Sequence, residues 1–208
     1  MSVSVASGLL LGVLLGLRHA LEPDHLAAVS VLITRRRSAG GGMMLGAAWG
    51  IGHALSLLVV GCVLAAVGGR LPARWSSLFE LLVAGMLLSL GLRAVLRRAH
   101  DAASAQRSAT VGRPLMVGVM HGLAGSGPLT AAALTTLPTT ATRLSYIALF
   151  GVGSVLGMAS LSGLVGLPLR RWEASRGAPV WLSTVTGTVS LVLGCAWGWS
   201  AITGLLNS

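Results

Sequence analysis

A short polar run near the start of the chain holds the side chains best suited to binding a metal ion. His19, Asp24 and His25 fall within seven residues, and apolar sequence flanks them on both sides. Imidazole nitrogens together with a carboxylate suit borderline divalent metals such as Ni²⁺, Co²⁺ or Zn²⁺. A charge at the centre of a bilayer costs roughly 2.5 to 3.5 kcal/mol, so a charged run in an apolar segment indicates a functional site.

The composition places this polar run inside a membrane. Hydrophobic residues make up 54% of the 208 residues and charged residues only 10%, whereas about a quarter of the residues in soluble domains are charged. Windows of about 20 residues predict six apolar helices. They cover residues 3–33, 43–67, 75–96, 112–137, 144–167 and 180–206. We therefore predict an all-α, multi-pass membrane protein in which residues 1–208 form a single transmembrane domain.

The distribution of positive charge predicts the orientation of the chain. The net charge is +10, all fifteen basic residues are arginine, and most of them lie in the first, third and fifth connections. Positively charged connections remain in the cytoplasm, so both termini are predicted to lie outside it. This pattern favours a prokaryotic cytoplasmic membrane, with the lipid bilayer as a partner, over nucleic-acid binding. A homo-oligomer or an accessory subunit remains open.

Two similar stretches predict an internal repeat. Residues 16–21 (GLRHAL) align with residues 118–123 (GVMHGL), and each half of the chain contains three apolar segments. Because three is an odd number, the two halves must cross the membrane in opposite orientations, as in many transporters. We predict one repeat over residues 3–96, a cytoplasmic loop over 97–111 and a second repeat over 112–206.

Helix geometry predicts that the histidines meet at one depth. At 1.5 Å per residue, His19, His53 and His121 lie roughly 14 to 20 Å from the starts of their segments, in a hydrocarbon core about 30 Å thick. The remaining histidine, His100, falls in the polar third connection, where we expect it to be solvated. The predicted metal ligands are His19, Asp24, His25, His53 and His121.

Pro23 is expected to break the first helix, because it lacks the backbone donor that would bond the carbonyl of His19. A break would let His19 and His25 turn toward one point. Arg18 and Glu22 have the four-residue spacing of a helical ion pair, and Glu22 could also carry a proton. The candidate supporting residues are Arg18, Glu22, Ser56 and Glu80. The predicted break and its glycine-rich counterpart comprise Pro23, Gly122, Gly125, Gly127 and Pro128.

The first polar motif resembles that of a known family. His19-x4-Asp24-His25, in a first transmembrane helix, is similar to the HX4DH signature of the nickel–cobalt transporter family. Gly52-His53 resembles the family's second conserved block, and residues 16–29 and 121–127 are similar to its short, urease-accessory-like branch. The resemblance implies a nickel or cobalt permease in which His19, Asp24 and His25 select the metal and His53 contributes.

The chain also departs from that family. Its better-studied members have eight spans where six are predicted here. Glu22 and Pro23 stand where the family's HAxDADH form has Asp and Ala. These departures leave the identity of the ion and the direction of transport open.

We expect a secondary transporter with no permanently bound cofactor and no enzymatic activity. The transported ion is predicted to be Ni²⁺ or Co²⁺, with Zn²⁺ also compatible. One alternative is a metal/proton antiporter that exports the ion. Another is a membrane acyltransferase with His19 as general base and Asp24 orienting it, but such enzymes hold this pair near the headgroups. Met116 and Met120 could offer sulfur to Cu(I), although their four-residue spacing is typical of a packing stripe.

Overall fold

Seven α-helices make up the described part of the chain, residues 2–33, 39–67, 72–96, 111–137, 139–172 and 178–206 of a computed structural model. They are α1 (Ser2–His19), α2 (Pro23–Ile33), α3 (Ala39–Val67), α4 (Ala73–Leu96), α6 (Gly112–Thr136), α7 (Thr140–Trp172) and α8 (Ala178–Leu206). The predicted all-α fold is confirmed. Each predicted apolar segment overlaps one helix, except the first, which overlaps both α1 and α2.

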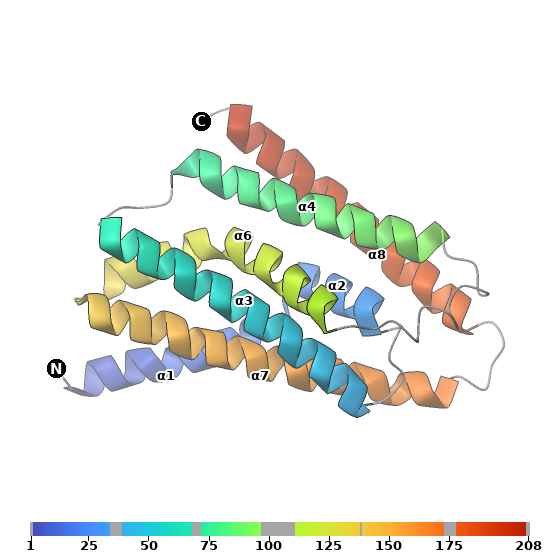
Figure 1. Ribbon diagram of the computed structural model, residues 1–208, viewed down its shortest axis with the longest axis horizontal. Helices are drawn as coiled ribbons and strands as arrows, with labels where there is room; N and C mark the ends of the chain where they lie inside the picture. Colours follow the sequence, from blue (N-terminus) through green and yellow to red (C-terminus); the bar gives the residue numbers. More distant parts are fainter. Residues whose placement is uncertain are drawn as a thin grey trace.

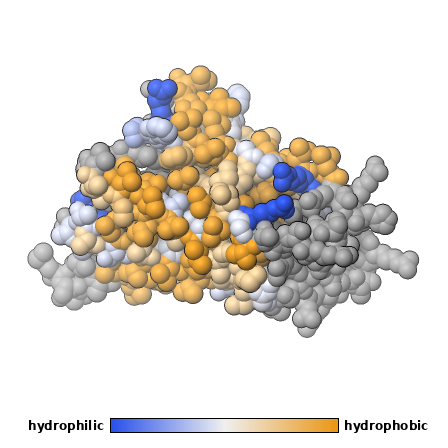
Figure 2. All heavy atoms as spheres, in the orientation of Figure 1, coloured by the Kyte–Doolittle hydropathy of each residue, from blue (hydrophilic) through white to orange (hydrophobic). Residues whose placement is uncertain are grey.

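The outer surface of the helices is apolar. Among the described residues, four helical stretches are long and apolar enough to cross a membrane: Gly40–Ala66, Arg74–Leu96, Thr140–Val165 and Trp181–Leu206. Large hydrophobic side chains such as Leu14, Val59 and Leu164 are more than half exposed, and Figure 2 shows hydrophobic residues over much of one described face. Because such a surface suits lipid rather than water, the chain is a multi-pass membrane protein.

The helices form a bundle in which α3 and α7 lie side by side at the centre. Helix α1 packs along α7, and α6 packs along α3. Helices α4 and α8 form a separate pair at one side, which α2 and α6 connect to the rest. Both ends of the chain lie at the same end of the bundle (Figure 1). This arrangement encloses the short helix α2 and the middle of α6.

The first apolar segment is interrupted where Pro23 predicts. Helix α1 ends at His19 and α2 begins at Pro23. In the turn between them, the backbone nitrogen of Leu21 donates to the carbonyl of Arg18 (2.9 Å), and that of Glu22 donates to the carbonyl of His19 (3.0 Å). These short-range bonds satisfy the last carbonyls of α1. Proline is favoured at the first position of a helix because its missing donor would be unpaired there in any case.

The glycine-rich stretch predicted as the counterpart of this break does not interrupt a helix. Helix α6 runs without interruption from Gly112 to Thr136, through Gly122, Gly125, Gly127 and Pro128. A proline inside a helix removes one hydrogen bond and bends the axis, but it need not end the helix. The first apolar segment of the first half is therefore split into two helices, whereas α6, the first helix of the second half, is continuous.

Glycines allow α3 and α6 to pack with their backbones in contact. A Cβ atom added at Gly52 would collide with the carbonyl oxygen of Leu115, and one added at Gly118 would collide with that of Trp49. In a membrane, where lipid tails are as apolar as the side chains, such close packing is a main source of helix association. This contact fixes the height of His53 relative to His121.

Candidate metal centre

Four helices each contribute part of one polar cluster. His19 is the last residue of α1, and Asp24 and His25 lie in the first turn of α2. His53 comes from the middle of α3 and His121 from the middle of α6. The structure therefore brings together all five residues for which the sequence predicts metal ligation.

The four imidazole rings are close neighbours. The ring centre of His25 lies 4.5 Å from that of His19, 5.3 Å from that of His53 and 4.7 Å from that of His121. The centres of His19 and His53 are 5.0 Å apart. His25, His53 and His121 are each at most 2% exposed, so the cluster lies inside the protein.

Carboxylates orient two of the imidazoles. Nδ1 of His19 lies 2.8 Å from Oε1 of Glu22, and Nδ1 of His25 lies 3.0 Å from Oδ1 of Asp24. A carboxylate on one ring nitrogen is the usual outer partner of a metal-binding histidine, because it fixes the ring and raises the basicity of the other nitrogen. In both rings, Nε2 is the nitrogen left for an ion.

Asp24 connects α2 to α6. Its Oδ1 also accepts a hydrogen bond from the backbone nitrogen of His25 (2.9 Å), and its Oδ2 lies 3.5 Å from Nε2 of His121. The position in the first turn of α2 favours a negative charge, because the helix dipole places partial positive charge there. Asp24 is therefore the acidic group of the cluster.

The histidines bury nitrogen atoms that have no hydrogen-bond partner among the described residues. Six imidazole nitrogens are buried without a hydrogen-bond partner among the described residues: His19 Nε2, His25 Nε2, both nitrogens of His53 and both of His121. Leaving such a polar atom unsatisfied costs about 1 to 3 kcal/mol. Two overlapping groups of these residues have ligand atoms within 4.8 Å of one another: His19 with His25 and His53, and Asp24 with His25 and His121. This arrangement is suited to a metal ion.

Two aromatic residues that were not predicted flank the cluster. Trp49 stacks on His25 with ring centres 5.3 Å apart and an interplanar angle of 23°, and its ring lies 5.6 Å from that of His121. Phe150 lies 5.2 Å from His19. Trp49 precedes His53 by four residues, the spacing that places two side chains on one helix face. That spacing is the signal that could have identified it.

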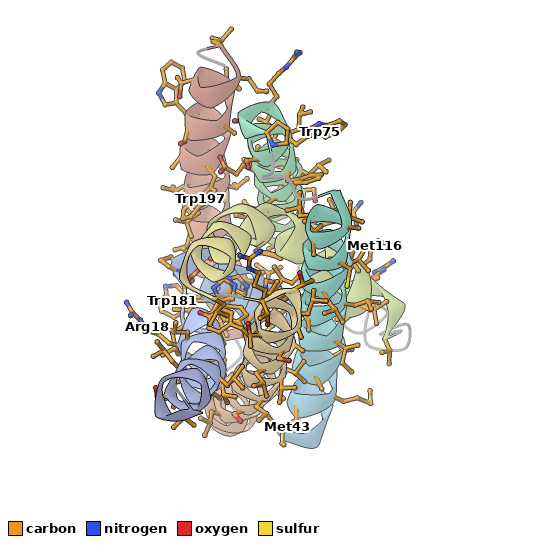
Figure 3. The ribbon with its side chains drawn as sticks, turned by 90° about the vertical axis from the view of Figure 1, so that its left-hand side faces the viewer. Arg18, Met43, Trp75, Met116, Trp181 and Trp197 are labelled. Carbon is orange, nitrogen blue, oxygen red and sulfur yellow. The ribbon has the colours of Figure 1, made fainter. Side chains whose placement is uncertain are left out.

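The predicted supporting residues lie in different places. Glu22 contacts His19, whereas the spacing predicted Arg18 as its partner. The helix ends before Glu22, so the four-residue rule no longer applies. The exposed side chain of Arg18 points away from the bundle in Figure 3. Ser56 is buried, and its hydroxyl donates to the carbonyl of His53 (2.9 Å). Glu80 belongs to neither metal-binding group found among the described residues.

The packing role predicted for the two methionines holds for Met120 only. Met120 packs against the buried apolar cluster around Trp49, whereas Met116 is exposed on the outside of α6 (Figure 3). His100 and the arginines of the third connection after residue 96 lie outside the described residues.

The fold and this cluster define a class: a multi-pass helical membrane protein with histidines and one aspartate gathered inside the bundle. Residues 6–108 match the NicO family model, described as high-affinity nickel-transport protein. The chain is 31% identical over 206 residues to the urease accessory protein UreH of Bacillus sp. (strain TB-90), covering 92% of this chain and 90% of that protein. The chain therefore belongs to the NicO family and is a transporter, not an enzyme. No solved structure matches it.

Proposed function

We propose that this protein is a permease that carries Ni²⁺ across a prokaryotic cytoplasmic membrane. The observation that carries the proposal is the group of buried, unpartnered imidazole nitrogens around Asp24. Nitrogen-rich ligand sets with one carboxylate favour nickel, cobalt or zinc over magnesium and calcium, which prefer oxygen. The description of the matching family model favours nickel among these. His19, Asp24, His25, His53 and His121 are the proposed ligands.

The proposed architecture has two inverted repeats of three membrane crossings each. The contact of α1 with α7 resembles that of α6 with α3. A Cβ at Gly16 would collide with the carbonyl of Phe150, just as one at Gly118 would collide with that of Trp49. Gly16 and Gly118 also align in the sequence repeat. In each pair the aromatic residue lies beside a histidine: Phe150 beside His19, and Trp49 beside His121.

Uptake is the favoured direction. A membrane potential of 100 mV, negative inside, supplies about 2.3 kcal/mol per charge, and therefore about 4.6 kcal/mol for a divalent cation. Export would have to overcome this energy by exchanging the ion for protons. We propose passive, potential-driven uptake, with both termini outside the cytoplasm.

The test is uptake of radioactive nickel into proteoliposomes with an imposed inside-negative potential. His25→Ala and Asp24→Ala should each lower the initial rate at least about tenfold, the lower end of the losses typical for residues that support metal sites. The control, His100→Ala, removes the remaining histidine and should leave the rate unchanged. Full-rate uptake by both site variants would contradict the proposed ligands. Potential-independent uptake coupled to a pH gradient would instead favour the antiporter.

A further inference from the structure

His25 is the common member of two different ligand groups. With His19 and His53 it forms a group of three imidazoles, and with Asp24 and His121 it forms a group of two imidazoles and one carboxylate. We call these the trihistidine position and the aspartate position. The ligand atoms within each group are less than 4.8 Å apart, which lets one ion contact all three after small side-chain movements.

The trihistidine position uses the free ring edges. Glu22 and Asp24 contact Nδ1 of His19 and of His25, respectively, and Nε2 of each ring has no hydrogen-bond partner among the described residues. Both nitrogens of His53 are fully buried and likewise have none within the described ranges. The three ring centres form a compact triangle with sides of 4.5, 5.0 and 5.3 Å.

The aspartate position lies on the other edge of His25. Nδ1 of His25 lies 3.0 Å from Oδ1 of Asp24, and Oδ2 of Asp24 lies 3.5 Å from Nε2 of His121. Nδ1 of His25 therefore faces the aspartate position, and its Nε2 is the nitrogen available to the trihistidine position. An ion at the aspartate position would take the place of the contact between His25 and Asp24.

The two positions differ in charge and in aromatic neighbour. The trihistidine position is made of neutral ligands, whereas Asp24 gives the other position a negative charge that binds a divalent cation more strongly. Phe150 lies against His19 of the first position, and Trp49 lies against His121 of the second. Phe150 on α7 therefore contacts the trihistidine position alone, whereas Trp49 on α3 contacts His121 and also stacks on the shared His25.

We propose that the transported ion passes between these two overlapping positions, binding Nε2 of His25 in the trihistidine position and Nδ1 of His25 in the aspartate position. This inference rests on the proposed metal transport. Two divalent cations so close together would repel strongly in a buried site, so only one position is filled at a time. His53 and His121 therefore belong to different coordination states of one transport cycle and never bind the ion together.

The test uses the full-length protein in detergent, with Co²⁺ as the probe and X-ray absorption to count imidazole ligands. His53→Ala removes only the trihistidine position and should bind one Co²⁺ through two imidazoles. His121→Ala removes only the aspartate position and should bind one Co²⁺ through three. His25→Ala should bind none at the same concentration. The first two variants should lose transport by at least about tenfold although each still binds the ion.

A single shared site gives a different result. If all four histidines held the ion together, His53→Ala and His121→Ala would show the same imidazole count, and this outcome would overturn the inference. The conservative variants His53→Gln and His121→Gln provide the same comparison if an alanine variant fails to fold. Ser190→Ala, in the α4–α8 pair, is the control and should match the unmodified protein. If the unmodified protein neither binds nor carries the metal, the proposed function itself fails.

Discussion

At the scale of single residues, His25 has the largest number of contacts within the candidate site. Its ring lies against those of His19, His53 and His121, and Trp49 stacks on its face. Because Asp24 precedes it directly and bonds both its ring and its backbone, its orientation is fixed at the start of α2. A change at His25 therefore disturbs every other member of the cluster.

Trp49 should report directly on metal binding. Its ring lies within 5.6 Å of His25 and His121, and its Nε1 is buried without a partner among the described residues. Ni²⁺ bound at this cluster should quench the Trp49 fluorescence. Trp49→Phe should abolish that part of the quenching. It should change the free energy of unfolding by no more than about 1 kcal/mol, because a six-membered aromatic ring remains and no hydrogen bond is lost among the described residues. A fluorescence titration with Ni²⁺ measures the effect.

Two comparisons give this prediction its controls. Trp49→Ala should destabilise the protein by about 3 to 5 kcal/mol, because it leaves a cavity beside His25. Trp75→Phe, at an exposed position in α4, should retain the quenching of the unmodified protein. Undiminished quenching in Trp49→Phe would show that nickel binds elsewhere.

The sequence predicted the polar part of the site and missed the aromatic part. His19, Asp24, His25, His53 and His121 could be found because polar residues are costly in apolar segments and therefore conspicuous. Trp49 and Phe150 are apolar residues in apolar helices, so composition does not distinguish them from ordinary packing. The partner of Glu22 was missed because it depends on the residue at which α1 ends.

At the scale of helices, hydropathy located the apolar helical segments, because a helix that crosses the bilayer needs about 20 predominantly apolar residues. Pro23 predicted the interruption between α1 and α2. The continuity of α6 could not be predicted in the same way. Pro128 lies in a similar sequence setting, and whether a proline bends or ends a helix depends on its tertiary neighbours. The helix pairs were also unpredictable, since many glycines were available as contacts.

The glycine contact between α3 and α6 should be sensitive to one methyl group. Gly118→Ala would drive a Cβ into the carbonyl of Trp49, and neither backbone can move without shifting His53 or His121. We expect the free energy of unfolding to fall by more than about 1 kcal/mol, the lower end of the range for overpacked cores. We also expect weaker metal binding. Thermal unfolding in detergent and a Co²⁺ titration measure the two effects.

Gly85 provides a matched control in α4. A Cβ added there meets nothing within 4 Å, and alanine favours a helix by up to about 1 kcal/mol over glycine. Gly85→Ala should therefore leave the midpoint of unfolding unchanged or raise it. Equal stability of Gly85→Ala and Gly118→Ala would contradict the close contact of α3 with α6.

At the scale of the whole molecule, the site lies where the broken half of the chain meets the continuous half. Four of the five proposed ligands lie on α1, α2 and α3 in the first half of the chain. The fifth, His121, lies on α6 in the second half. Ser154, which is buried on α7, aligns with His53 in the proposed repeat but offers a hydroxyl instead of an imidazole. This asymmetry gives the two proposed ion positions different ligands.

The proposed orientation of the molecule in the membrane rests on the distribution of its arginines and can be measured directly. Both chain ends lie at one end of the bundle (Figure 1), and the first, third and fifth connections are rich in arginine. Positively charged connections stay in the cytoplasm, so a reporter fused after Ser208 should lie outside. Alkaline phosphatase, which is active only outside the cytoplasm, should be active there, and a fluorescent protein that matures only inside should be dark. Replacing Arg35, Arg36 and Arg37 with serine should weaken this preference. A bright cytoplasmic reporter on the unmodified chain would contradict the predicted orientation.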